Sequence, residues 1–212
     1  MLKYLFFLFF IRPFIFFVLG VNVRKYENLP KNGPAIIIAN HNSHIDTLLL
    51  MSLFPVGMIN KIHPVAAADY FCNTKFKSFF FKTLIGIIPI DRKITKDNIK
   101  TLFNGIYEAL DNKEIIIIYP EGTRGDDNKI GSFKTGIAHI AKQKPDTPII
   151  PIYINGPDKI LPKVDSLIVP FISDVYIGEQ ITYDNKSAQD FTAEIQQAVL
   201  NLKSLHTKKE TL

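Results

Sequence analysis

Isoleucine-rich runs alternate with amphipathic stretches along most of the chain. The runs predict buried strands at 35–39, 86–90, 114–119 and 148–154, with a further strand inside 58–67 and two later ones at 167–171 and 174–181. Spacing of three to four residues between apolar positions predicts helices at 44–54, 71–84, 95–110, 132–142 and 187–205. This alternation is typical of an α/β fold with a single mixed, largely parallel sheet flanked by helices.

Residues 1–26 differ from the rest and predict an N-terminal helical membrane anchor ahead of a domain of residues 27–212. Arg12-Pro13 divides this stretch into two apolar runs, each shorter than the roughly 18 to 20 residues of a spanning helix. We expect a bent helix pair or re-entrant segment in one leaflet, with four basic residues at head-group level: Lys3, Arg12, Arg24 and Lys25. The alternative is one tilted spanning helix with a proline kink.

The stretch 71–84 places phenylalanines on one helical face and lysines on the other. This pattern fits a helix at a membrane surface, and equally an ordinary helix with its apolar face on the core.

The charge of the chain is unevenly distributed. Its net charge is +5, and residues 1–100 hold 13 Lys and Arg against 5 Asp and Glu, whereas residues 101–212 hold 12 against 15. The basic half predicts an anionic partner, and its interleaving with apolar runs favours a lipid bilayer over nucleic acid. The single cysteine, Cys72, permits no disulfide within the chain, which suits the cytoplasmic face of an inner (cytoplasmic) membrane.

The stretch Asn-His-Asn-Ser-His-Ile-Asp, residues 40–46, joins a predicted strand to a predicted helix. Ser43 and Asp46 have the spacing of a capping box, which is a purely structural explanation for both. The same turn can bring His41 onto Asp46, so that the carboxylate orients the imidazole and leaves its other nitrogen as a general base. Without an apparent serine or cysteine nucleophile, such a pair would activate a substrate hydroxyl directly. Metal binding by His41, His44 and Asp46 is a weaker alternative.

Two more polar joints follow isoleucine-rich strands. The run 86–90 leads into Asp91-Arg92, and the run 114–119 leads into Pro-Glu-Gly-Thr-Arg, residues 120–124. Ligands of open α/β sheets bind outside the carboxyl ends of the strands, so we expect Arg92 and Arg124 near His41, suited to holding a phosphate. The alternative for each arginine is a surface ion pair, with Asp91 or with Glu121.

These motifs, in this order, resemble four blocks of the glycerolipid acyltransferase family. The chain has NHNSHID at 40–46, GIIPIDR at 86–92, YPEGTR at 119–124 and TPIIP at 147–151, and its size and layout are similar to the bacterial 1-acyl-sn-glycerol-3-phosphate acyltransferase group. The sequence FKTG at 133–136 resembles the FKxG that often follows the third block. Three departures are Tyr119 where phenylalanine is commoner, Gly125 where serine is commoner and Ala67 where lysine is frequent.

The resemblance implies a role for each matching residue. His41 would be the general base and Asp46 its orienting partner, and Pro151 would belong to the block associated with the acyl donor. The acceptor-binding positions would be Arg92, Glu121, Gly122, Thr123 and Arg124, with Lys134 adding charge to the phosphate pocket.

The implied reaction moves a fatty acyl group to the free hydroxyl of lysophosphatidic acid, giving phosphatidic acid. The acyl thioester, either acyl-CoA or acyl-carrier protein, would be a co-substrate, with no other cofactor and no metal. Backbone amides at the 40–46 joint would stabilise the oxyanion. The alternatives are another lysophospholipid or an ornithine-type lipid as acceptor, and a lipid-binding protein without catalysis.

Overall fold

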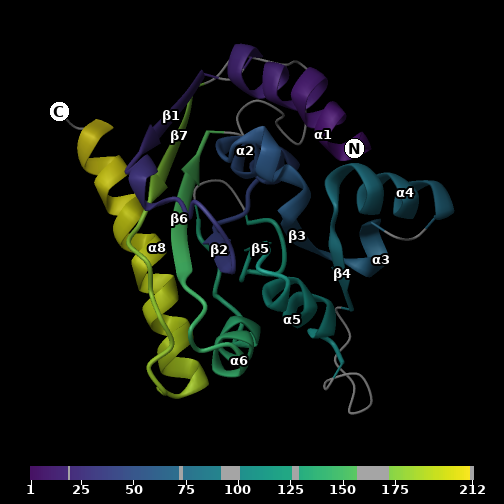
Figure 1. The fold of residues 1–212 in the computed structure, drawn as a ribbon. Helices are drawn as coiled ribbons and strands as arrows, with labels where there is room; N and C mark the ends of the chain where they lie inside the picture. The colour runs from purple at the N-terminus through teal and green to yellow at the C-terminus, as the bar shows by residue number, and fades with distance from the viewer. Residues whose placement is uncertain (19, 72–73, 92–100, 126–128, 157–171, 211–212) are drawn as a thin grey trace.

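A computed structural model describes residues 1–18, 20–71, 74–91, 101–125, 129–156 and 172–210. Their strands form one sheet in the order β1-β7-β6-β2-β5-β3-β4 (Figure 1). The strands are β1 (Gly20–Arg24), β2 (Ala35–Ala39), β3 (Ile62–Ala67), β4 (Ile88–Ile90), β5 (Ile115–Ile118), β6 (Ile149–Asn155) and β7 (Ile172–Ile177). Only the β6–β7 pair is antiparallel among these described strands, which confirms the mixed, largely parallel sheet.

The isoleucine runs form the centre of the sheet, where helices cover both faces. Ile37, Ile117 and Ile152 face a core shared with the N-terminal helix and α2, whereas Ile36, Ile116 and Tyr153 face a core shared with α5, α6 and α8. The covering helices are α2 (His44–Leu53), α5 (Asn104–Asp111), α6 (Gly136–Gln143) and α8 (Ala188–Glu210). Burial on both faces explains why these strands are apolar without alternation.

Some connections between these elements are short helical turns. They comprise η3 (Tyr26–Asn28), η4 (Val56–Lys61), α3 (Ala68–Phe71), α4 (Lys75–Phe80) and the π-helical η5 (Phe81–Ile85). Within 71–84 the regular helix begins at Lys75, where Thr74 accepts a hydrogen bond from the Lys77 N–H, rather than at Phe71 as expected.

The N-terminal segment packs against the sheet domain. Its helical turns are α1 (Leu2–Phe6), η1 (Phe7–Ile11) and η2 (Phe14–Val18), and a stripe of Phe7, Ile11 and Ile15 is buried in the core. Lys3 is also buried and donates to the Ile62 carbonyl at 2.7 Å, so its predicted place among lipid head groups is wrong. Arg12 likewise donates to the Phe54 carbonyl, at 2.6 Å. Of the helices that the structure describes, none has the length and hydropathy required to cross a bilayer.

One strand was not predicted. Residues 20–24 pair in parallel with β7, as edge strand β1, where we expected the end of the anchor. The alternation of Val21 and Val23 with exposed neighbours is the strand signal, but it is only five residues long and runs into basic residues.

Several predicted boundaries also differ. The described part of the helix expected at 95–110 begins at Asn104, and residues 95–100 lie outside the described residues. Helix α6 begins at Gly136 rather than at Ser132. The strand expected at 167–171 lies outside the described residues as well.

Candidate active site

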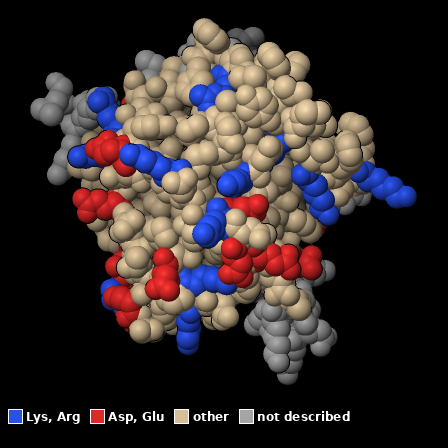
Figure 2. Space-filling view, viewed as in Figure 1, with Lys and Arg blue, Asp and Glu red and all other residues tan. Residues whose placement is uncertain are grey.

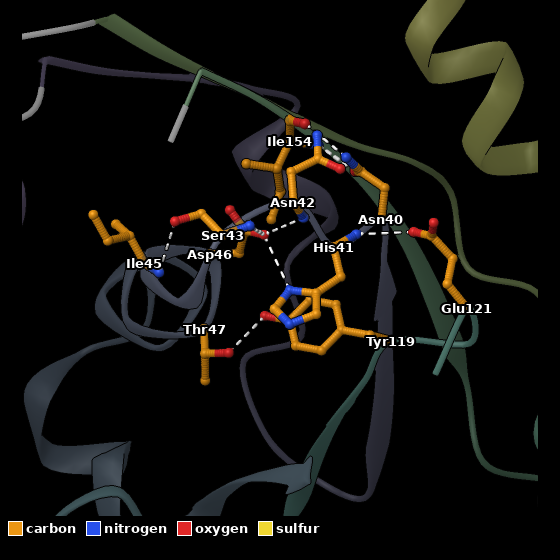
Figure 3. A network of polar contacts seen from close by, with 10 residues as sticks. All are labelled: Asn40, His41, Asn42, Ser43, Ile45, Asp46, Thr47, Tyr119, Glu121 and Ile154. Atoms are coloured by element: carbon orange, nitrogen blue, oxygen red, sulfur yellow. Dashed lines mark hydrogen bonds and ion pairs between the residues drawn. The ribbon is translucent and has the colours of Figure 1, made fainter. Parts of the chain in front are cut away.

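His41 and Asp46 meet at the carboxyl ends of the central strands. The chain leaves β2 at Ala39 and turns before α2, which brings His41 Nδ1 to 3.1 Å from Asp46 Oδ2 (Figure 3). Asp46 is 1% exposed and the His41 side chain is 16% exposed. An ionised carboxylate can only accept, so this contact assigns the proton to Nδ1 and leaves Nε2 with its lone pair.

The capping box is present in the same turn. The Ser43 hydroxyl accepts from the Ile45 N–H at 3.3 Å, and Asp46 Oδ2 accepts from the Ser43 N–H at 2.7 Å and the Asn42 N–H at 2.8 Å. The two interpretations of this stretch are therefore compatible, because one carboxylate oxygen both caps α2 and contacts the imidazole.

Asn40 explains one of the amides in the stretch. Its side chain donates to the Ile154 carbonyl at 2.9 Å and accepts from the Ile154 N–H at 2.8 Å, and the residue is buried. The amide thus extends the β2–β6 ladder by one step beyond the last paired residue, Ala39. Asn40 is a structural residue that fixes where His41 leaves the sheet.

Glu121, in the segment 120–124, connects that segment to the segment 40–46 through hydrogen bonds. Its two carboxylate oxygens accept from the His41 N–H at 2.9 Å and from the Gly131 N–H at 2.7 Å. Burial raises the pKa of Glu121, and the two backbone hydrogen bonds oppose that rise. The Gly125 N–H completes the connection by donating to the His41 carbonyl at 2.8 Å. Glu121 therefore positions the His41 backbone, and the substrate-binding role that the resemblance implied for it stays a prediction.

Tyr119 and Thr47 are functional candidates that the sequence did not single out. The Tyr119 ring stacks on the His41 ring, with centroids 4.1 Å apart and planes inclined by 20°. Its hydroxyl lies 3.0 Å from Thr47 Oγ1 (Figure 3). The sequence feature that could have pointed to Tyr119 is its difference from the phenylalanine expected at this place in the third block.

The basic side chains expected to hold a phosphate lie in the same region. Gly122 has a φ of +73°, a left-handed conformation that favours glycine, and a Cβ at this position would lie 2.6 Å from Lys134 Nζ. Thr123, Arg124 and Lys134 are exposed. Burial lowers the pKa of His44, and the positive charges of Arg124 and His41 lower it further. Arg124 therefore lies near enough to His44 to affect its protonation.

Pro151, a predicted site residue, is not part of this group. Pro151 is buried inside β6, opposite Ile38, and its carbonyl accepts from the Gly178 N–H at 2.8 Å, so it belongs to the sheet. Arg92 lies outside the described residues, as does Cys72.

Three amides of the joint at 40–46 are already used in hydrogen bonds within the protein. The N–H groups of His41, Asn42 and Ser43 all donate to carboxylates of the protein itself. Among the described residues, no group of three His, Cys, Asp or Glu side chains is arranged to hold a metal ion. What the described geometry offers is an oriented imidazole beside basic side chains.

Comparison with known proteins agrees with this geometry. The curated 1-acyl-sn-glycerol-3-phosphate acyltransferase of Saccharomyces cerevisiae is 34% identical over 140 residues, which cover 65% of this chain and 44% of the yeast protein. The mouse 1-acyl-sn-glycerol-3-phosphate acyltransferase alpha is 31% identical over 136 residues, covering 64% of this chain and 45% of the mouse protein. The chain thus spans less than half the length of these relatives.

A solved structure has the same fold. The 1-acyl-sn-glycerophosphate (LPA) acyltransferase PlsC of Thermotoga maritima superposes with a TM-score of 0.70 at 22% identity, covering 94% of this chain and 76% of that one. The family model described as Acyltransferase matches residues 20–155. The span of that match, together with the named relatives, means that the chain belongs to the glycerolipid acyltransferase family.

Proposed function

We propose that the protein transfers a fatty acyl group from an acyl thioester to the free hydroxyl of lysophosphatidic acid, giving phosphatidic acid. The observation that carries this proposal is the contact of His41 Nδ1 with the buried Asp46 carboxylate, at the rim where α/β sheets bind ligands. The printed names of the yeast and mouse relatives support the choice of acceptor.

The reaction needs only one proton carrier. His41 Nε2 takes the proton of the acceptor hydroxyl as its oxygen attacks the thioester carbonyl carbon. The tetrahedral intermediate then expels the thiolate by breaking the C–S bond, and His41 returns the proton to the sulfur. Asp46 holds the ring and stabilises the imidazolium that exists between the two transfers.

The acceptor phosphate would lie against Arg124 and Lys134. Both side chains are exposed, and the Lys134 side chain passes over Gly122 in the loop that holds the His41 backbone. A guanidinium and an ammonium on one side of the base suit a phosphate monoester better than a zwitterionic head group.

The test is release of free thiol from palmitoyl-CoA and, separately, from palmitoyl-acyl-carrier protein, by purified protein in detergent. Each donor is assayed without acceptor and with lysophosphatidic acid, lysophosphatidylglycerol or a lyso-ornithine lipid, and the lipid product is identified by mass. We expect the fastest release with lysophosphatidic acid. His41→Ala should lower that rate by about 10²- to 10⁴-fold, whereas His139→Ala, which removes an exposed histidine on α6, should leave it unchanged.

Two results would contradict the proposal. A preference for a phosphate-free acceptor would reassign the substrate. Absence of acceptor-dependent release with both donors, together with saturable binding of the lysolipid, would indicate a lipid-binding protein.

We also propose that the protein works on the surface of an anionic bilayer, on the cytoplasmic side of an inner membrane. Exposed phenylalanines gather on the N-terminal helix and on α4, and we call them the aromatic surface: Phe9, Phe10, Phe16, Phe17, Phe76 and Phe79. Phe17 is 89% exposed and Phe76 is 77% exposed. Ring contacts of Phe6 with Phe10 and with Phe80, at 5.9 and 6.1 Å, connect the two parts.

Charge favours lipid as the occupant of this surface. Lys75, Lys77 and Lys82 are exposed beside Phe76 and Phe79. In Figure 2 the region over the N-terminal helix and α4 is uncharged with isolated basic side chains, and the acidic side chains gather below it. Aromatic rings flanked by lysines insert at the boundary between acyl chains and anionic head groups.

The membrane proposal is tested by co-sedimentation with vesicles of phosphatidylcholine alone and with 30% phosphatidylglycerol, a composition that carries roughly the charge of an anionic leaflet. We expect binding to the charged vesicles that weakens with salt. The pair Phe76→Ser and Phe79→Ser should reduce it several-fold, whereas Leu205→Ser, at an exposed leucine of α8, should not. Equal binding by all variants would contradict this assignment of the surface.

A further inference from the structure

Tyr119 connects three elements around the imidazole. It follows β5, its ring lies against the His41 ring at 4.1 Å, and its hydroxyl lies 3.0 Å from Thr47 in the first turn of α2. The same turn of α2 carries Asp46, which contacts His41 Nδ1. The imidazole is thus held at its edge by a carboxylate and on its face by a ring that is itself tied to the carboxylate's helix (Figure 3).

One hydrogen bond to Nδ1 only loosely restrains an imidazole, because small torsions about the Cα–Cβ and Cβ–Cγ bonds can still tilt the ring plane while the bond is kept. A second ring stacked at an inclination of 20° fixes the plane, and therefore the direction of the Nε2 lone pair. An aromatic face also attracts a cation, so the stack is stronger when His41 carries the proton taken from the acceptor.

The hydroxyl of Tyr119 is a holding group and not a proton donor for the reaction. Burial raises the pKa of Tyr119 well above its usual range, and the negative charge of Asp46 raises it further, while the contact with Thr47 acts in the opposite direction. The phenol therefore stays neutral across the working pH range and lends the imidazole no negative charge.

We propose that Tyr119 is a positioning residue for His41, with its ring setting the plane of the imidazole and its bond to Thr47 setting the position of the ring. This inference rests on the proposed acyl transfer with His41 as base. A phenylalanine at position 119 would keep the stack and lose the connection to Thr47.

The test uses Tyr119→Leu, Tyr119→Phe, Thr47→Val and the double variant Tyr119→Phe with Thr47→Val, assayed for kcat, KM and pH dependence with the preferred acceptor. Tyr107→Leu is the control, because Tyr107 is a partly buried tyrosine on α5 that packs against the other of the two cores from Tyr119. Thermal melting of each variant identifies any that fails to fold.

Tyr119→Leu should lower kcat by about tenfold to a hundredfold with KM within about twofold. It should also move the acidic limb of the pH–rate profile to lower pH, because the imidazolium loses its aromatic partner. Tyr119→Phe should recover most of that loss. Tyr119→Phe and Thr47→Val should each cost only about two- to fivefold, and the double variant no more than either, because both remove one and the same bond.

Three results would overturn the inference: an unshifted acidic limb in Tyr119→Leu, a change in KM alone, or additive effects of Tyr119→Phe and Thr47→Val. Failure of the proposed function is a different result, because the wild-type protein would then lack acceptor-dependent thiol release. If the wild type is active and Tyr119→Leu matches Tyr107→Leu, only the positioning role fails.

Discussion

Two histidine–carboxylate pairs lie at opposite edges of the parallel part of the sheet, one after the carboxyl end of β2 and one at the amino ends of β3 and β5. His41 Nδ1 is 3.1 Å from Asp46 at the carboxyl ends, and His63 Nε2 is 3.2 Å from Glu114 at the amino ends of β3 and β5. By residue type and distance the two pairs are nearly the same. Pairing with a carboxylate is therefore not what makes His41 a candidate base.

The other ring nitrogen separates the two pairs. His63 Nδ1 lies 2.8 Å from the Gly86 carbonyl, and Nε2 is buried facing Glu114 without a hydrogen bond, so both nitrogens are turned toward groups of the protein. Burial lowers the pKa of His63, and the positive charge of the adjacent Lys3 lowers it further. In His41 the contact with Asp46 uses one nitrogen, and the neighbouring aromatic ring covers the face of the imidazole. A base needs an oriented ring with an uncommitted nitrogen, and His63 does not satisfy the second condition.

The largest expected difference between the pairs is catalytic. Asp46→Asn should lower kcat by about 10²- to 10⁴-fold, because an amide can still accept the capping N–H groups but removes the charge that orients and stabilises the protonated ring. Glu114→Gln should change kcat by less than about threefold. Initial rates of acceptor-dependent thiol release measure both, with far-ultraviolet circular dichroism to verify folding. Similar losses in the two variants would remove the functional distinction between the ends of the sheet.

The sequence predicts the contact between His41 and Asp46 better than it predicts the surroundings of these two residues. The turn after 35–39 and the capping spacing of Ser43 and Asp46 are local features, so the sequence alone indicates that His41 and Asp46 lie together. The stack of Tyr119 on His41 joins residues 78 positions apart, and it depends on the pairing of β2 with β5, which no local pattern reports.

The same reasoning explains the errors in the fold. Buried strands such as β2 and β6 have long apolar runs, whereas β1 has only Val21 and Val23 and lies within the range predicted as anchor. The expectation for Lys3 was a place among head groups, because a lysine in an apolar run usually reaches toward a charged surface. The partners that bury it, Ile62 and Glu114, are distant in the sequence.

A second difference concerns the free energy of unfolding contributed at the carboxyl ends of the strands. Asn40→Ala leaves the buried N–H and carbonyl of Ile154 without their side-chain partner, so the free energy of unfolding should fall by about 2 to 4 kcal/mol. Urea denaturation measures the change. The control Asn201→Ala, at an exposed residue of α8, should stay within about 0.5 kcal/mol of wild type. A comparable loss in both variants would mean that the hydrogen bonds between the Asn40 side chain and the Ile154 backbone contribute no special stability.

The smallest expected effect concerns the pair at the amino ends of β3 and β5. It is a change in the free energy of unfolding that appears only as pH changes. Burial lowers the pKa of Lys3 from 10.5 to about 7, against the opposing attraction of Glu114. Below pH 7 Lys3 is protonated in both the folded and the unfolded chain. Between about pH 7 and 10.5 the unfolded chain binds more protons, so this residue makes the folded state more stable as pH rises.

Lys3→Met should abolish that contribution. The free energy of unfolding of wild type minus that of Lys3→Met should increase from pH 7 to pH 9 by up to roughly 1 kcal/mol per pH unit, as measured by urea denaturation at each pH. Taking the difference cancels the groups that titrate alike in both proteins, whereas His63 and Glu114, which interact electrostatically with Lys3, can differ between them. Lys142→Met, at an exposed lysine of α6, should give a difference that is flat with pH. A flat difference for Lys3→Met would mean that Lys3 keeps its proton in the folded state, and the amino end would then be held by a charged cluster rather than by a buried neutral amine.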